Sequence, residues 1–169
     1  MGAEKYARSC GVKIGKECII YTTDWGAEPY LVEIGDHTTI GYDVNCITHD
    51  GGVFVFRKED PSFDVFGKVK IGSNTFIGNN TIILPGVSIG DNCVIGTGSV
   101  VTKSIPDNAV AAGLPCRYVC SIQEYHQQMI KLNMKTHTMS YHRKREVILT
   151  QKDDTLFIKK DLIEGGVRN

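Results

Sequence analysis

Residues 69–103 read VKIGSNTFIGNNTIILPGVSIGDNCVIGTGSVVTK and carry an aliphatic residue at every sixth position. These positions are Ile71, Ile77, Ile83, Ile89, Ile95 and Val101. A helix repeats every 3.6 residues and a strand every 2, so neither predicts a strict period of six. A six-residue repeat is typical of short parallel strands stacked in a coil. The stretch therefore predicts an all-β solenoid, and the unbroken phase disfavours an ordinary β-sandwich.

A second fixed position, four residues after the aliphatic one, holds a small side chain. Its occupants in this stretch are Thr75, Thr81, Val87, Cys93 and Ser99. The Gly, Asn and Asp residues between the repeats suit corners, because they tolerate positive φ. Cys18 and Cys93 fall on the small position and Cys46 on the aliphatic one, so we expect buried thiols in place of disulfides.

The same phase extends toward the N-terminus with two interruptions. It begins at Ile14, breaks for a loop over 22–30, resumes at Ile34 and ends again at Ile47. The second break, residues 50–68, holds four phenylalanines and fits no six-residue register. A long irregular loop inside a regular coil is usually functional. Part of it reads as a short hairpin, VFVF against FDVF, and residues 1–11 carry no clear signal.

The pattern changes after the coil. Apolar residues at helical spacing predict an amphipathic helix over 121–133. We also expect a second helical segment over 141–150 and a strand over 155–159. We therefore divide the chain into a β-helix domain, 1–119 with the loop insertion 50–68, and a C-terminal helical extension, 120–169.

The composition is that of an ordinary globular protein. The 169 residues contain nineteen Lys and Arg and nineteen Asp and Glu. This balance does not indicate a broad basic surface for binding nucleic acid or an anionic membrane. The N-terminal residues lack the apolar core of a signal peptide, and no run is long enough to be inserted across a membrane. We expect a cytoplasmic protein.

The repeats and the following VVTKSIPDNAVAAGLPCRYV, residues 100–119, resemble the hexapeptide-repeat acyltransferases. Within that family the similarity is to galactoside, maltose and xenobiotic acetyltransferases and to acetyltransferases of capsule and O-antigen sugars. The resemblance covers residues 12 to 120. It implies a left-handed parallel β-helix and a homotrimer that binds acetyl-CoA in clefts between subunits. The handedness comes from the resemblance alone, because general rules favour right-handed crossovers.

Acetyl transfer from a thioester needs a base for the attacking hydroxyl or amine and donors for the developing oxyanion. His49 is our candidate base: it stands where the repeat ends and the long loop begins, its pKa class suits neutral pH, and the family's catalytic His matches this position. Asp50 is a candidate catalytic helper that orients His49, or simply a turn former. We expect surface or packing roles for the remaining histidines, which are His37, His126, His137 and His142.

The resemblance also assigns cofactor-binding residues. It implies an oxyanion-binding backbone N–H in the repeat containing Gly78 and Asn79. The further residues that it implies for acetyl-CoA are Asn79, Thr97, Thr102 and Lys103 along the groove and Arg117 at the phosphates or adenine end. A lysine and an arginine suit phosphate groups. Two departures from the family pattern are Thr97, where relatives often have Ala, and Cys120, where some carry Arg.

The acceptor is expected near His49, between subunits. The candidate substrate-binding residues are Tyr21, Asp24, Trp25 and Tyr30 in the first loop and Phe54, Phe56 and Arg57 in the second. Aromatics beside polar groups suit a sugar ring, and they equally suit subunit contacts.

On this resemblance we expect an acetyl-CoA-dependent acetyltransferase that modifies a hydroxyl or amine of a sugar, such as a nucleotide-linked amino sugar or a polysaccharide precursor of capsule or O-antigen. The alternative on the same scaffold is a xenobiotic, chloramphenicol-type O-acetyltransferase. A zinc enzyme with this coil would need three histidine ligands, and the coil contains only His37 and His49, so we expect no metal. A catalytically inactive scaffold is disfavoured by the presence of His49, Lys103 and Arg117 together.

Overall fold

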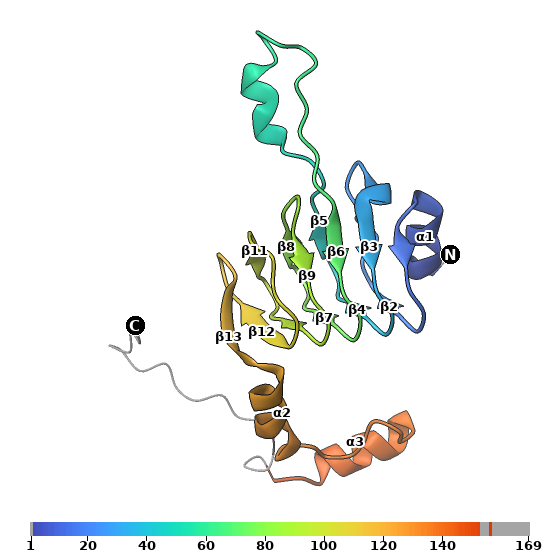
Figure 1. Cartoon of the computed structure of the whole chain (residues 1–169). Helices are drawn as coiled ribbons and strands as arrows, with labels where there is room; N and C mark the ends of the chain where they lie inside the picture. The colour runs from blue at the N-terminus through green and yellow to red at the C-terminus, as the bar shows by residue number, and fades with distance from the viewer. Residues whose placement is uncertain (1, 153–155, 157–169) are drawn as a thin grey trace. The chain divides into compact units, whose positions relative to one another are not determined.

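The computed structural model describes residues 2–152 and residue 156. The chain divides into two compact units, residues 1–125 and residues 126–169, which are described separately below. The described strands all lie in the first unit, together with an N-terminal helix, and the described part of the second unit is helical (Figure 1). The predicted change from strands to helices near residue 120 agrees with the order of the elements.

Three parallel sheets build the first unit. The first sheet has β1 (Lys13–Ile14), β3 (Val32–Ile34), β6 (Val69–Ile71) and β9 (Ser88–Ile89). The second has β2 (Ile19–Ile20), β4 (Thr39–Ile40), β7 (Phe76–Ile77), β10 (Val94–Ile95), β12 (Ala109–Ala112) and the antiparallel β13 (Arg117–Ser121). The third has β5 (Asn45–Cys46), β8 (Ile82–Ile83) and β11 (Val100–Val101).

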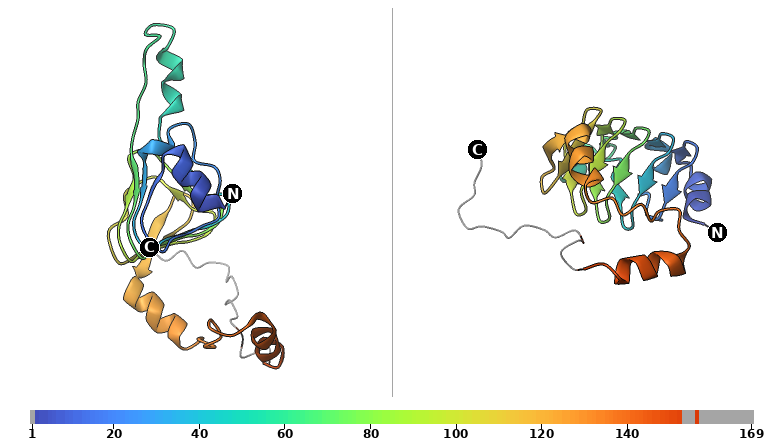
Figure 2. Two further views of the ribbon diagram at one scale, coloured as in Figure 1. Left: turned by 90° about the vertical axis from the view of Figure 1, so that its right-hand side faces the viewer. Right: turned by 90° about the horizontal axis from the view of Figure 1, so that it is seen from below.

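The chain visits these sheets in rotation, one short strand in each. Residues three repeats apart are therefore direct neighbours: Ile71 pairs with Ile89, and Ile77 pairs with Ile95. Viewed along the stack, the three sheets form the sides of a prism (Figure 2). The six-residue phase thus predicted parallel strand stacking correctly, because each repeat supplies one strand and one corner.

The aliphatic position of the repeat fills the interior of the prism. Ile77, Ile83, Ile95 and Val101 are all completely buried. Fully burying such a side chain contributes about 1.5–3 kcal/mol before entropy is counted. The small position is buried as well, and its hydroxyls find acceptors inside the corner: Thr81 Oγ1 donates to the Gly78 carbonyl at 2.7 Å.

The corners use the residue types that tolerate a left-handed backbone. Asn74 and Asn92 have φ values of 51° and 55° at equivalent corners, and Asn108 has 60°. The Asn74 side chain donates to Asn92 at 2.9 Å, and the Asn92 side chain donates to Asn108 at 3.1 Å. These side-chain ladders join successive coils at the corner, alongside backbone hydrogen bonds such as that from the Asn92 N–H to the Ser73 carbonyl at 2.9 Å.

A helix precedes the first strand, which the sequence reading did not anticipate. Helix α1 (Ala3–Cys10) buries Ala7 completely against the core. Arg8 donates to the carbonyls of Ile14 at 2.6 Å and Gly15 at 2.7 Å. The helix lies at the N-terminal end of the stack (Figure 1), where it supplies packing and hydrogen-bond donors.

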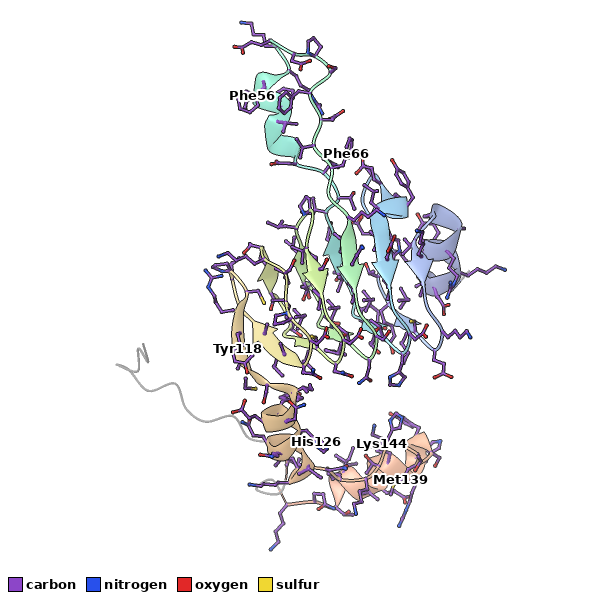
Figure 3. All side chains as sticks on the ribbon, in the orientation of Figure 1. Phe56, Phe66, Tyr118, His126, Met139 and Lys144 are labelled. Carbon is purple, nitrogen blue, oxygen red and sulfur yellow. The ribbon has the colours of Figure 1, made fainter. Side chains whose placement is uncertain are left out.

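The loop over 50–68 projects from the prism (Figures 1 and 2). The expected pairing of VFVF with FDVF is wrong, because Gly51–Phe56 forms the 3₁₀ helix η2. Antiparallel pairing is limited to a bridge between His49 and Phe66 at the base of the loop. Phe66 lies near that base and Phe56 farther out (Figure 3), and Phe56 remains 52% exposed.

The C-terminal helices occur where the sequence predicts them. Helix α2 (Ile122–Ile130) spans the division between the units, and α3 (Tyr141–Leu149) starts behind Ser140, whose hydroxyl accepts from the Arg143 N–H at 3.4 Å. The strand expected over 155–159 lies outside the described residues, apart from residue 156. None of the described helices combines the length and apolar character that a membrane span requires.

All six cysteines are free, as expected for Cys18, Cys46 and Cys93 from their positions in the repeat. Cys46 and Cys93 are buried in the core, and Cys18 is partly buried against it. Burial raises the pKa of the Cys46 thiol to about 12. These thiols act as small apolar side chains in the interior of the stack.

Candidate active site

Two edges of the prism carry the residues singled out in the sequence. The turns that follow strands of the third sheet, residues 47–49, 84–87 and 102–105, form what we call the histidine edge. The turns that precede those strands, residues 41–44, 78–81 and 96–99, form the asparagine edge. The third sheet lies between these two edges, since each of its strands runs from one to the other.

His49 stands on the histidine edge with its side chain 43% exposed. Its Nδ1 lies 2.8 Å from Oε2 of Glu28, whose side chain is only 15% exposed. Thr48 Oγ1 donates to the same carboxylate oxygen at 2.7 Å. The hydrogen bond from His49 and then that from Thr48 lower the pKa of Glu28, so the carboxylate is charged at neutral pH.

This contact assigns the imidazole tautomer. An ionised carboxylate only accepts hydrogen bonds, so Nδ1 of His49 carries a proton and donates it to Glu28. The second ring nitrogen, Nε2, is then the basic one when the ring is neutral. A histidine held by a carboxylate in this way is able to act as a general base.

A hollow of about 550 Å³ adjoins His49 on the histidine edge. Its lining residues are Ile47, His49, Asp50, Gly51, Val65, Phe66, Gly67, Leu84, Pro85, Gly86 and Thr102. The ring of Phe66 meets that of His49 edge-on, with the centroids 6.5 Å apart. Of the predicted site residues, the hollow brings together His49, Asp50 and Thr102, and the exposed Lys103 follows directly in the chain.

Asp50 has a different partner from the one expected. Its Oδ1 accepts from the Gly52 N–H at 2.9 Å and caps η2. The carboxylate that contacts the His49 ring is that of Glu28, twenty-one residues earlier in the chain. Sequence reasoning missed Glu28, and the single available signal was that the first break in the repeat, residues 22–30, contains it.

The predicted cofactor residues Gly78, Asn79 and Thr97 lie together on the asparagine edge. Asn79 Oδ1 accepts from the Tyr42 N–H at 3.0 Å, and the Asn79 carbonyl accepts from the Gly98 N–H at 2.9 Å. A Cβ on Gly78 would stand 2.8 Å from the Cα of Thr97, so this glycine is required for the close stacking of repeats. Thr97 itself is exposed.

Arg117 opens β13, directly after the hairpin that follows β12. Its guanidinium is exposed and donates to the carbonyl of Cys116 at 3.0 Å. The preceding residues join the third sheet, because the Cys116 N–H donates to the Val100 carbonyl at 2.8 Å. Arg117 thus lies at the C-terminal end of the stack.

The predicted acceptor residues separate into three places. Tyr21 stacks on Tyr42 with ring centroids 4.6 Å apart, and Asp24 accepts from the Asn45 amide at 3.2 Å. Trp25 is only 3% exposed and packs in the core, so it does not lie on the surface with its neighbours.

The remaining acceptor candidates are exposed. Tyr30 is 60% exposed in the first loop, and Phe54 is 71% exposed on the projecting loop. Arg57 pairs with Asp64 and donates to the Phe63 carbonyl, which braces the outer part of that loop. One chain by itself therefore does not gather these side chains around His49.

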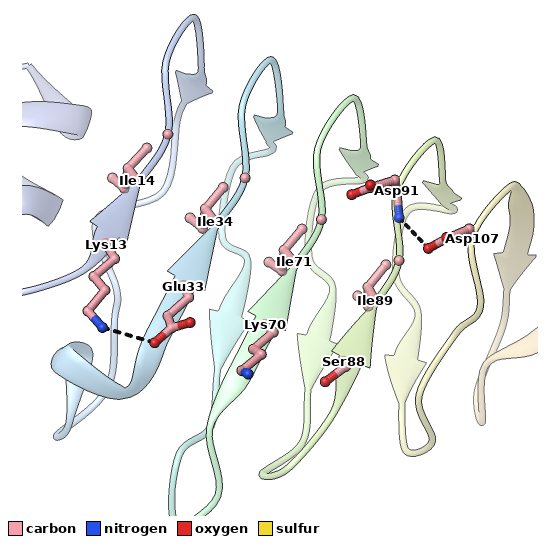
Figure 4. A pocket seen from close by; sticks show the side chains of 14 residues that line it. Lys13, Ile14, Glu33, Ile34, Lys70, Ile71, Ser88, Ile89, Asp91 and Asp107 are labelled. Carbon is pink, nitrogen blue, oxygen red and sulfur yellow. Dashed lines mark hydrogen bonds and ion pairs between the residues drawn. The ribbon is translucent and has the colours of Figure 1, made fainter.

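A second hollow, of about 600 Å³, follows the first sheet (Figure 4). Lys13 and Glu33 form an ion pair of 3.1 Å there, and the hydrogen bond from Lys13 lowers the pKa of Glu33. Lys70 and Ser88 continue the row across the sheet. The lining of this second hollow contains none of the predicted site residues. Among the described residues, no three His, Cys, Asp or Glu side chains group as metal ligands do.

Comparison with known proteins places this geometry in a family. The family described as bacterial transferase hexapeptide (six repeats) matches residues 68–103. Protein CapG of Staphylococcus aureus is 43% identical over 152 residues, which cover 88% of each chain. Galactoside O-acetyltransferase of Escherichia coli K12 is 43% identical over 98 residues, which cover 57% of this chain and 47% of that enzyme.

Two solved structures carry the same fold. A galactoside acetyltransferase in complex with coenzyme A has a TM-score of 0.56 and 29% identity, over 73% of this chain and 72% of that one. A hexapeptide-repeat acetyltransferase of Vibrio cholerae complexed with acetyl coenzyme A has a TM-score of 0.56 and 25% identity, over 66% and 60%.

The fold of three parallel sheets and the matched repeats define a transferase scaffold. The chain belongs to the hexapeptide-repeat transferase family, in the branch that contains sugar acetyltransferases. This confirms the predicted family and, with it, the predicted class of enzyme, an acyltransferase. The chain spans about half the length of the E. coli galactoside enzyme and most of CapG.

Proposed function

We propose that the protein transfers an acetyl group from acetyl-CoA to a hydroxyl or amine of a sugar, with His49 as general base. The observation that carries the proposal is the contact of His49 Nδ1 with Glu28, which leaves Nε2 as the base beside the hollow. The complexes of related acetyltransferases with coenzyme A and acetyl coenzyme A support the cosubstrate. We assign the orienting role to Glu28 in place of Asp50.

The proposed reaction is a direct attack on the thioester. Nε2 of His49 accepts the proton of the acceptor group as its oxygen or nitrogen bonds to the thioester carbonyl carbon. The resulting imidazolium is stabilised by the Glu28 carboxylate. The C–S bond then breaks, and the CoA sulfur leaves with the proton from His49. The Gly78 N–H already donates to the Ile95 carbonyl at 2.9 Å, so the N–H of Asn79 is our candidate donor to the oxyanion.

We further propose that the prism winds as a left-handed β-helix and that three chains complete each other's sites. His49 lies on the histidine edge, whereas Asn79 and Thr97 lie on the asparagine edge with the third sheet between them. Placing the histidine edge of one subunit against the asparagine edge of the next would form a cleft containing both sets. Thr102 and Lys103 would then line the same cleft from the side of His49.

A complementation experiment tests this shared site. His49→Ala and Thr97→Trp variants are co-expressed with two different tags and purified through both. Each should be weakly active alone, the second because the large side chain fills the proposed groove on the asparagine edge. Mixed trimers then contain some clefts with an intact His49 from one chain and an intact Thr97 from the other, so activity should reappear. If mixed oligomers stay as inactive as either variant, both residues act within one chain and the shared cleft is wrong.

The acceptor surface that we propose is built on the first loop. The stacked Tyr21 and Tyr42 offer an aromatic face, and Asp24 with Asn45 offers hydrogen-bonding groups at the same edge. This combination suits a sugar, whose C–H face stacks on a ring while its hydroxyls meet polar groups. Buried Trp25 is left out of this surface.

The direct test measures free thiol release from acetyl-CoA in the presence of a panel of sugars and amino sugars. His49→Ala should lower kcat by roughly 10²–10⁴-fold. A matched control is His37→Asn, because His37 has φ of 52°, which Asn tolerates, and its ring contacts Asn74 at a corner away from the histidine edge. Near-normal turnover of His49→Ala, or activity on chloramphenicol-type alcohols without any on sugars, would contradict the proposal.

A further inference from the structure

The even charge of the whole chain conceals a segregation between its two units. Residues 1–125 contain ten Lys and Arg against fourteen Asp and Glu, a formal net charge of −4. Residues 126–169 contain nine against five, a net charge of +4, and also three of the five histidines. The net charge of the whole chain is zero because these two values cancel. It therefore does not exclude an attraction of the second unit to an anionic surface. The positive charge belongs to the unit that the transferase site does not use.

Helix α3 concentrates this charge beside exposed apolar side chains. One of its faces is formed by Tyr141, Lys144, Arg145, Ile148 and Leu149, which line a shallow hollow of about 330 Å³. Tyr141 is 76% exposed and Leu149 is 66% exposed. Spacings of three, four and seven residues place these side chains on the same side of a helix.

The remaining side chains of α3 are those of His142, Arg143 and Glu146, which are exposed, and of Val147, which is half-buried. In the part of the chain that the structure describes, the ion pair within α3 joins Arg143 to Glu146 at 3.2 Å, with both side chains about two-thirds exposed. Lys144, marked in Figure 3, and Arg145 stand on the face that also carries the apolar residues. The apolar and cationic groups therefore share one exposed surface, which we call the α3 face, comprising Tyr141, Lys144, Arg145, Ile148 and Leu149.

The combination of apolar and cationic groups on the α3 face favours one class of binding partner over others. Lys and Arg stems lie along an apolar surface while their charges reach outward, and aromatic and aliphatic residues between them enter the boundary of headgroups and acyl chains. A soluble polyanion would pair with Lys144 and Arg145 but would leave Ile148 and Leu149 in contact with water. We propose that the α3 face docks the protein on the surface of an anionic lipid bilayer, peripherally and reversibly. This goes beyond the proposed transfer reaction and does not depend on it.

Vesicle sedimentation of the full chain tests the proposal. We expect binding to vesicles that mix phosphatidylcholine with phosphatidylglycerol, little binding to phosphatidylcholine alone, and weakening at high salt, because salt screens the attraction. Each cation near an anionic leaflet contributes to the free energy of binding, and the loss of three cations should weaken vesicle binding roughly 100-fold. The variant with Arg143, Lys144 and Arg145 all changed to Gln measures this.

A matched control changes the net charge equally on the other unit. Lys5, Lys16 and Lys58 are exposed in residues 1–125, and their joint change to Gln should leave vesicle binding within about twofold. Equal losses in both triple variants would show that net charge alone attracts the protein, and that result overturns the docking surface. Absence of binding by the unaltered protein overturns it as well.

A third variant separates a lipid from a soluble polyanion. Changing Ile148 and Leu149 to Ser should weaken vesicle binding roughly tenfold, because their apolar area no longer enters the bilayer. Unchanged binding of this variant would contradict lipid docking. Circular dichroism and thiol release with soluble substrates accompany all variants. We expect both to be unchanged, so a failed docking test and a failed transferase test remain distinguishable.

Discussion

Removal of the Glu28 carboxylate is expected to slow the proposed transfer reaction by misplacing His49. The carboxylate holds His49 Nδ1 at 2.8 Å and Thr48 Oγ1 at 2.7 Å through one oxygen, so it determines both the tautomer and the direction of the ring. Because 43% of the His49 side chain is exposed, few packing contacts are available to position the ring once the hydrogen bond to Glu28 is lost. The perturbation we propose is Glu28→Ala, with Glu28→Gln as its conservative partner.

The magnitude follows from two bounds. Loss of a general base costs about 10²–10⁴-fold in rate, and Glu28→Ala leaves the base in the chain, so its effect should be smaller. Displacing a reacting group by about 1 Å costs on the order of 10²-fold. We therefore expect kcat to fall roughly 10–100-fold. Glu28→Gln should lose less, since its amide oxygen still accepts from Thr48 and His49 while the charge is gone.

The assay is thiol release from acetyl-CoA over a range of acceptor concentrations and pH. A positioning role predicts a lower kcat with KM changed little and an altered pH profile in Glu28→Ala. Glu33→Ala is the matched control, because Glu33 is also an ion-paired glutamate but lies on the first sheet with Lys13. Normal kcat in Glu28→Ala combined with a large loss in Asp50→Asn would refute the reasoning and return the role to Asp50.

Three further predictions concern the stability of the prism. Gly90→Ala should lower the free energy of unfolding by about 1–3 kcal/mol in urea denaturation, because a Cβ there would stand 2.6 Å from the Asp107 backbone nitrogen; Gly51→Ala, with open space around it, should be nearly neutral. Cys46, whose thiol pKa is raised to about 12, should resist thiol reagents at neutral pH until the protein unfolds, and rapid labelling of the native protein would contradict its placement. The pKa of Glu28 is lowered by folding, so its contribution to stability is present above the unfolded value and is lost as the pH falls through the folded one. The melting temperature should therefore fall as the pH drops below the ordinary glutamate pKa of about 4.3, and Glu28→Gln should flatten that dependence.

Much of the fold could be predicted because the decisive pattern is local. A side chain every six residues can only be buried throughout if each repeat forms one strand and one corner, and Ile71, Ile89 and Ile95 obey this in the structure. Helix α1 escaped prediction, because its anchors are contacts with the end of the stack: Ala7 in the core and Arg8 on two carbonyls. Ala3, Tyr6, Ala7 and Cys10 do fall at helical spacing, but a single pattern over eight residues is too short to predict a helix by itself.

The sequence alone determined the family, the parallel sheets, the free cysteines and the position of His49 at the end of a repeat. Tertiary structure decided which groups meet. Glu28 reaches His49, and Trp25 enters the core, because the path of the first loop across the third side of the prism brings residues twenty or more positions apart together. Periodicity specifies which way a side chain points within its own repeat. It carries no information about the path of a loop that leaves the repeat, and that path selects the partner of the candidate base.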